Sequence, residues 1–170
     1  MNILELIKTR RSIRKFDISK TVSDEQVSDL LTAAMYAPSA GNQQVWQFIT
    51  IRNKLTFEKI NEFHPFSSML KQSDLVVLVC GDSSIEAKPG YWPVDCAAAT
   101  QNILLAAHGL GLGAVWLGVY PVLERQVGMS QLLNIPEHIH PFSLVVIGYS
   151  AEEKKMPERF KPERIHSENW

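Results

Sequence analysis

Residues that could hold a phosphate lie within the first twenty positions of the chain. The segment Arg10-Arg11-Ser12-Ile13-Arg14 brings three guanidinium groups and one hydroxyl together. Guanidinium forks match the oxygens of a phosphate monoester in geometry and in charge. The first twenty residues carry six cations against two anions, although the whole chain has a net charge of −1. From charge alone, a phosphate site and a solvated basic face explain this segment about equally well.

Other polar or aromatic groups could complete a site. The segment Pro38 to Gln44 offers amides and a hydroxyl, although local Ser and Asn hydrogen bonds in a plain loop are the commoner role of this composition. Phe63 and Phe66 could wall a substrate pocket, and such residues are more often simply core. Asp95 is the only formal charge in a long apolar stretch, where a first-turn charge at a helix start is its alternative role.

The usual signatures of side-chain chemistry are missing from the sequence. Gly109, Gly111 and Gly113 follow a predicted helix and precede a predicted strand, the reverse of a dinucleotide fingerprint. The histidines have no Cys or carboxylate at ligand spacing, so no metal site is expected. Cys80 and Cys96 lie in apolar runs and are expected to be buried thiols. If the chain is an enzyme, a bound cofactor therefore carries the reaction.

The element that must organise such a site is a helix predicted over residues 93–110, followed by a tight turn and a buried strand over 114–119. Pro93 suits the first turn, and the glycines from Gly109 onward end the helix. A helix that is apolar or small nearly all round must be buried on all sides, and 170 residues supply little core for this. A partner subunit could supply the missing cover. A membrane span is disfavoured because polar residues interrupt the run.

The remaining pattern indicates one domain covering residues 1–170. Ser23 and Gln26 form a capping box at the start of a helix that ends near Pro38. Further predicted elements are a strand at 46–52, short helices at 54–63 and 67–72, strands at 75–80 and 142–148, and a helix at 121–133. A polar tail follows from Ser150 to Trp170 and is expected to wrap another surface. The net charge disfavours bulk nucleic-acid binding, and no leader pattern is seen, so a cytoplasmic protein is expected.

Three blocks of the sequence resemble signature blocks of the nitroreductase family, in the same order. They are Arg10 to Phe16, Ala37 to Phe48, and Gly111 to Gly118. The likeness extends to the tail around Arg159 and covers essentially the whole chain. It implies an α+β fold with a mixed sheet flanked by helices, in an intertwined homodimer that binds one FMN at each of two interface sites. The dimer would also bury the central helix.

The resemblance implies roles for the basic residues. Arg10, Arg11 and Ser12 match residues that hold the FMN phosphate, with Arg159 of the tail joining them. Arg14 matches the cation beside the N1 and O2 edge of the flavin, where a fixed positive charge favours reduction.

It also implies roles for two further segments. The loop that the partner subunit lays against the cofactor matches Pro38, Ser39 and Asn42, and Asp95 matches a polar position near the ribityl hydroxyls. The strand end beside the isoalloxazine matches Trp116, Leu117 and Gly118, with the Leu117 amide as a candidate donor to N5. Two departures are Val45, where the family commonly has proline, and a short span from Asn53 to Asp74 that leaves little chain for a substrate lid.

The function expected from the resemblance is an FMN-dependent oxidoreductase that uses NADH or NADPH as electron donor. Its acceptors would be small molecules such as nitroaromatics or quinones, reduced in a two-step hydride-transfer cycle without a catalytic side chain. Dehalogenation, dehydrogenation of a modified peptide, and flavin binding or storage without turnover remain open alternatives. A cofactor-free dimeric interaction module is a further one.

Overall fold

Four antiparallel strands form the central layer of the structure, a computed structural model that describes residues 2–170. The spatial order is β1-β2-β4-β3, and the strands are β1 (Trp46–Ile51), β2 (Leu75–Asp82), β3 (Gly113–Gly118) and β4 (Ile139–Gly148). The mixed sheet that was expected is thus antiparallel among its named strands, and parallel pairing is confined to an isolated bridge between Ser12 and Ala114. β2 is buried along its whole length because helices cover both faces of the sheet.

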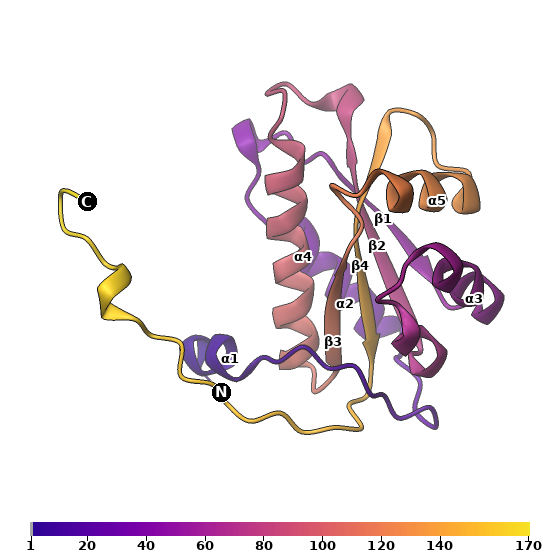
Figure 1. The fold of residues 1–170 in the computed structure, drawn as a ribbon, viewed down its shortest axis with the longest axis horizontal. Helices are drawn as coiled ribbons and strands as arrows, with labels where there is room; N and C mark the ends of the chain where they lie inside the picture. The colour runs from indigo at the N-terminus through magenta and orange to yellow at the C-terminus, as the bar shows by residue number, and fades with distance from the viewer. Residues whose placement is uncertain (1) are drawn as a thin grey trace.

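Two helical layers flank this sheet (Figure 1). On one face lie α2 (Asp24–Met35) and α4 (Trp92–Gly109), which pack against each other and against the strands. On the other face lie α3 (Lys54–Phe63) and α5 (Leu123–Leu133). Each face has its own apolar cluster, one containing Leu30 and Ile103 and the other Phe57 and Met129. This arrangement confirms the α+β class.

Most predicted boundaries agree with the structure to within two residues. The Ser23 and Gln26 capping box is present, with both reciprocal hydrogen bonds formed. The helix predicted over 67–72 is a 3-10 helix, Ser68–Gln72. The remaining short elements are α1 (Ile3–Thr9) and 3-10 turns at Ala40–Asn42, Ser83–Ile85 and Pro162–Arg164. Cys80 and Cys96 are buried as predicted, and burial raises the pKa of the Cys80 thiol to about 12.

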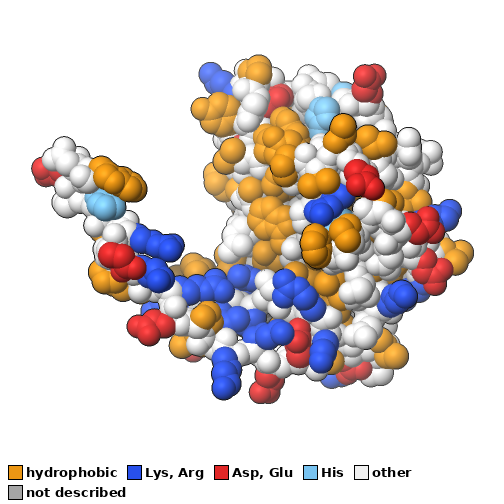
Figure 2. All heavy atoms as spheres, viewed as in Figure 1, with side chains coloured by type: hydrophobic (Ala, Val, Ile, Leu, Met, Phe, Trp, Pro, Cys, Tyr) orange, Lys and Arg blue, Asp and Glu red, His pale blue; other side chains and the backbone are white. Residues whose placement is uncertain are grey.

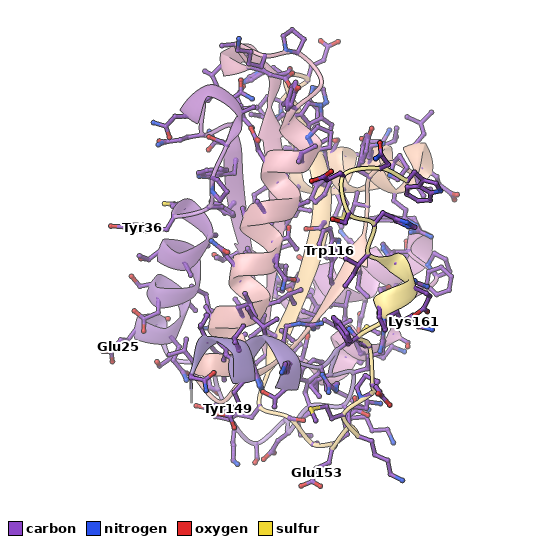
Figure 3. All side chains as sticks on the ribbon, turned by 90° about the vertical axis from the view of Figure 1, so that its left-hand side faces the viewer. Glu25, Tyr36, Trp116, Tyr149, Glu153 and Lys161 are labelled. Carbon is purple, nitrogen blue, oxygen red and sulfur yellow. The ribbon has the colours of Figure 1, made fainter. Side chains whose placement is uncertain are left out.

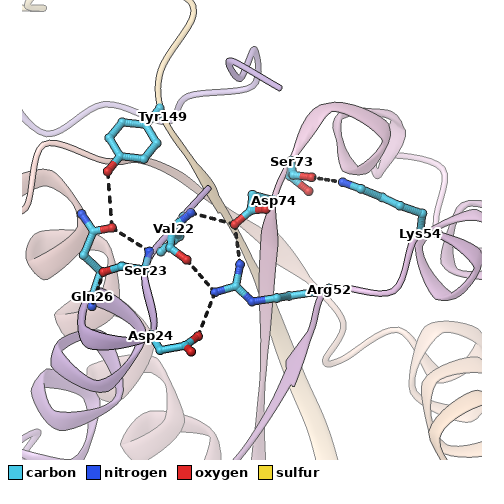
Figure 4. A network of polar contacts seen from close by, with 9 residues as sticks. All are labelled: Val22, Ser23, Asp24, Gln26, Arg52, Lys54, Ser73, Asp74 and Tyr149. Atoms are coloured by element: carbon cyan, nitrogen blue, oxygen red, sulfur yellow. Dashed lines mark hydrogen bonds and ion pairs between the residues drawn. The ribbon is translucent and has the colours of Figure 1, made fainter. Parts of the chain in front are cut away.

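A polar network joins the beginning of α2 to the ends of β1 and β2 (Figure 4). Arg52 contacts Asp74 at 2.5 Å and donates to the Val22 carbonyl at 2.7 Å. Asp74 also accepts from the Val22 amide at 2.8 Å. The cation and the carboxylate thus satisfy both backbone groups of Val22 where the chain turns into the helix.

The two ends of the chain meet beside β3. Asp17 donates its amide to the Tyr149 carbonyl, and Ala151 donates to the Lys15 carbonyl, at 2.9 Å each. The tail beyond Ser150 therefore starts alongside residues 11–17 and then extends away from the body of the molecule (Figure 1).

One side of α4 has no cover within residues 2–170. Figure 3 shows α4 facing the viewer, with α1 across its lower end and the tail to one side. Buried residues of α4, such as Ala99 and Ile103, face the sheet and α2, whereas Val94 is 63% exposed. The burial on all sides predicted for this helix is thus incomplete in a single chain.

Candidate functional site

Three arginines gather where the segment after α1 meets the tail. Arg11 is tied in place, because its guanidinium donates to the backbone carbonyls of Lys8, Arg10 and Lys155 at 2.7 to 3.1 Å. In the described chain, the Arg10 and Arg159 side chains have neither an acidic partner nor a protein acceptor. Figure 2 shows Lys and Arg side chains in a band along the lower edge of the molecule, running onto the tail.

The positive charges of these arginines lie close enough together to influence the pKa of Arg10. Burial lowers the pKa of Arg10 from its usual value, and the neighbouring Arg159 and Arg11 lower it further. The pKa of His108 is also lowered, by burial and by Arg10 and Arg11, which favours its neutral form. A partly buried group of cations of this kind attracts anions electrostatically.

A cavity of about 400 Å³ adjoins these arginines. Arg10, Arg11, His108 and Lys154 contribute to its wall, and Glu153 is its one carboxylate. The His108 Nε2 atom lies 2.8 Å from the Thr9 hydroxyl, which links α4 to the end of α1. Sequence analysis did not single out Lys154, and it considered His108 only as a possible metal ligand.

The segment from Arg10 to Arg14 runs parallel to β3. Ser12 pairs with Ala114, and the Ile13 amide donates to the Ala114 carbonyl at 3.0 Å. Over such an extended segment, Arg10 and Arg14 are separated by roughly 13 Å. One elongated ligand lying along this edge could therefore contact both arginines.

Beside Arg14 lies a second cavity, of about 430 Å³. Arg14 lines it together with the predicted strand end, Trp116, Leu117 and Gly118, so tertiary structure brings these two predicted groups together. The exposed Phe66 also lines it. Phe63 does not, because its ring packs against Gly128 on α5, where an added Cβ would approach the ring to 2.7 Å. The predicted pairing of Phe63 with Phe66 is therefore not found.

β3 is an edge strand, and its open edge faces this cavity. The carbonyls of Ala114 and Gly118 both bond away from β4, to Ile13 and to His64 and Arg125. Because backbone groups alternate along a strand, Trp116 shares that open side, whereas the Leu117 amide turns toward β4. The amides of Trp116 and Gly118, rather than the predicted Leu117 amide, thus face the open edge.

The Gly118 carbonyl has two donors that sequence analysis missed. His64 Nε2 lies 3.0 Å away, and Arg125 donates from Nη1 at 2.8 Å. His64 is 1% exposed, and burial, with Arg125 nearby, lowers its pKa. Because a carbonyl only accepts, Nε2 carries the proton, and Nδ1 is left unprotonated with no partner among the described residues. No motif pointed to either residue, because they come from separate elements.

The loop predicted to touch the cofactor lies elsewhere in the single chain. Asp95 is buried and binds this loop, accepting from the Ala40 amide at 2.9 Å and from Gln43 at 3.0 Å. Asp95 and His108 lie 13 residues apart on α4, or about 20 Å along its axis. Pro38, Ser39 and Asn42 are therefore near one end of α4, and the arginines are near the other.

Among residues 2–170, no helix combines the length and the apolar composition required to cross a bilayer.

The fold and site define an α+β protein that can hold an elongated ligand with an anionic end against an edge strand. The nitroreductase family model matches residues 7–65 and 65–149, and the chain belongs to that family.

Relatives agree with this assignment over nearly the full chain. A protein from Methanothermobacter thermautotrophicus, provisionally named NADH dehydrogenase/NAD(P)H nitroreductase, is 51% identical over all of this chain and 88% of its own length. A crystal structure of a protein of the same name from Parabacteroides distasonis has a TM-score of 0.93 at 35% identity, covering 98% of both chains. A Desulfovibrio desulfuricans structure, provisionally named a nitroreductase in complex with FMN, has a TM-score of 0.85 at 30% identity, covering 100% and 99%.

Proposed function

We propose that this chain is an FMN-dependent NAD(P)H oxidoreductase that reduces nitroaromatic or quinone-type acceptors as a homodimer. The family and the names of relatives support the enzyme class, the cofactor and the electron donor. The observation that carries the proposal is an arrangement along the edge strand β3. Arg10 and Arg159, which have no acidic partner in the described chain, lie near one end of it, and the cavity beside Arg14 lies near the other end.

The residues present fit FMN. Arg10 and Arg159 offer free guanidinium groups for a phosphate, and Ser12 lies between Arg10 and Arg14 in the sequence. Arg14 and the open-edge amides of β3 offer positive groups to the ring system. The cavity lined by Arg14 and Trp116 to Gly118 is called the ring-side cavity. Among the described residues no carboxylate lines it, so a flavin ring that gains negative charge would meet no repulsion there.

When bound, FMN would supply hydride chemistry, accepting from NAD(P)H and passing electrons to the acceptor. The protein binds the phosphate, orients the ring and places the Arg14 charge beside it. A charge fixed before the reaction needs no reorganisation during it, which is the largest contribution that such a site can make.

A second copy of the chain completes the proposed site. The loop of Pro38, Ser39 and Asn42 lies about 20 Å along α4 from the arginines of its own chain. The open side of α4 offers a surface on which two copies could pack, and each copy would then lay its loop against the site of the other.

The experiment is a titration of FMN against apoprotein, followed by flavin fluorescence. The double change Arg10→Ala and Arg159→Ala should weaken binding by about a hundredfold or more, because each of the two charge-assisted hydrogen bonds is worth about 1.5 to 3 kcal/mol. Lys161→Ala removes a tail cation that already faces Glu163 and is the matched control. Unchanged FMN affinity in the double variant would exclude the phosphate assignment.

Turnover is tested separately, by mixing the FMN-loaded protein with NADH or NADPH without oxygen. Bleaching of the flavin absorbance, followed by its recovery on adding a nitroaromatic or a quinone, is expected. Bleaching that recovers only with a halogenated acceptor would favour dehalogenation. Flavin that does not bleach with either nucleotide would favour storage.

A further inference from the structure

Arg125 lines the ring-side cavity, and most of its hydrogen-bond donors have no acceptor in the described chain. Its guanidinium carries five N–H donors, and one of them bonds to the Gly118 carbonyl at 2.8 Å. The guanidinium carbon lies over the ring of Phe66, 5.4 Å from the ring centroid. Within residues 2–170, no carboxylate lies within ion-pair distance of it. The side chain is thus fixed in direction, by a carbonyl and a ring, without being neutralised.

The stability of α5 does not explain a cation at this position. Arg125 is the third residue of α5, where the positive end of the helix dipole disfavours a cation. Glu124 beside it has the sign that the dipole prefers. An arginine held in the first turn is better explained by a negative group that approaches from the cavity, which would interact with the helix end and the guanidinium together.

The cavity itself selects for negative charge. Arg14 and Arg125 line it, and none of its lining residues is Asp or Glu. Its apolar surface comes from Phe66, Met69 and Trp116, which suits an aromatic ring. The combination fits a small aromatic molecule with an acidic substituent better than it fits a neutral one.

We propose that Arg125 determines acceptor specificity by binding the carboxylate of an aromatic acid, so that nitroaromatic or quinoid carboxylates are preferred over their neutral analogues. This rests on the proposed function, because the acceptor must reach this cavity beside bound FMN. Arg125 binds the carboxylate with its free N–H groups while its bond to Gly118 keeps the guanidinium plane in place.

The test compares 4-nitrobenzoate with methyl 4-nitrobenzoate, which is neutral, using FMN-loaded enzyme and NADH. Arg125→Gln removes the charge and keeps an N–H donor, whereas Arg125→Lys keeps the charge. Relative to wild type, Arg125→Gln should lower kcat/KM for the acid about tenfold to a hundredfold and change that for the ester less than about twofold. Arg125→Lys should retain more activity on the acid than Arg125→Gln. Because each ratio is taken between variants on one substrate, the different intrinsic reactivities of acid and ester cancel.

Lys59→Gln, which removes an exposed cation on α3, is the control for net charge. Equal losses for acid and ester in Arg125→Gln would overturn the inference, since they would indicate a structural role through Gly118. A rise in the KM for NADH without discrimination between the acceptors would also overturn it, by assigning the cation to the nucleotide. Wild-type enzyme that fails to oxidise NADH with any acceptor would instead contradict the proposed function.

Discussion

The Gly118 carbonyl accepts hydrogen bonds from two side chains that come from different elements, His64 and Arg125. His64 is almost completely buried, and its Nδ1 lone pair has no donor in the described structure. Protonating Nδ1 would place a charge in the interior close to the Arg125 cation. The lowered pKa of His64 reflects this cost, with burial as its main cause.

Acidification should destabilise the protein through this histidine. The folded-state pKa of His64 lies below that of the unfolded chain, which is about 6.5. Between these two values the unfolded state binds more protons, so the free energy of unfolding should fall as pH falls below about 6.5. Thermal unfolding of the FMN-free protein from pH 7.5 to pH 5 should show this slope, and His64→Gln should flatten it.

His108 contributes in the same direction, so part of the slope should remain in His64→Gln. His166→Gln, in the exposed tail, is the control for removing a histidine outside the core. A His64→Gln protein with an unchanged slope would show that His64 does not titrate with a shifted pKa.

At the scale of elements, the network around Arg52 joins the start of α2, the end of β1 and the start of β2 (Figure 4). Asp74 is partly buried and bonds to both Arg52 and the Val22 amide, whereas Asp24 is exposed and lies 3.7 Å from the guanidinium. The stabilisation should therefore come from Asp74 and Val22 rather than from Asp24.

Arg52→Met keeps the apolar stem and removes the donors of this network. The loss should be about 1 to 3 kcal/mol of unfolding free energy, since Asp74 loses its cation and the Val22 carbonyl loses its donor. Urea unfolding at pH 7 measures it as a lower midpoint with an unchanged slope. Lys161→Met breaks an exposed pair with Glu163 and should not move the midpoint. An equal midpoint for Arg52→Met and wild type would show that the network does not stabilise the fold.

Element boundaries were predictable where local signals set them. The capping box at Ser23 and Gln26 satisfies backbone donors within four residues, so it required no tertiary information. The short helix at 67–72 was predicted without a helix type and is a 3-10 helix, because a single short turn has little propensity signal to separate 3-10 from α. Phe63 was placed in the pocket because aromatic composition does not reveal which side of a helix packs against a neighbour.

At the scale of the whole molecule, α1, α4 and the tail are among the segments that expose large apolar side chains. Ile3 and Leu4 of α1 are each 64% exposed, as is Ile165 of the tail, and Val94 of α4 is 63% exposed. Apolar surface distributed over α1, α4 and the tail is typical of an obligate interface. The tail and the open side of α4 are therefore the expected contacts of a second copy.

We expect the protein to have twice its chain mass of 19.2 kDa in analytical ultracentrifugation. Val94→Glu places a charge on the open side of α4 and should shift the mass toward the monomer, with weaker FMN binding because the partner loop is lost. Leu55→Glu charges a similarly exposed residue on α3 and should leave the dimer intact. A monomeric wild-type protein that binds FMN tightly would contradict the two-chain site.

The sequence by itself determined the family, the helix and strand pattern, and the grouping of Arg10, Arg11, Ser12 and Arg14, because these depend on residues adjacent along the chain. Tertiary structure alone decided that Arg14 meets Trp116 to Gly118 and that His64 and Arg125 share one carbonyl. It also decided that Asp95 binds the loop at Ala40. Most of these contacts join positions tens of residues apart, and all of them arise from how helices and an edge strand pack, which no local pattern encodes.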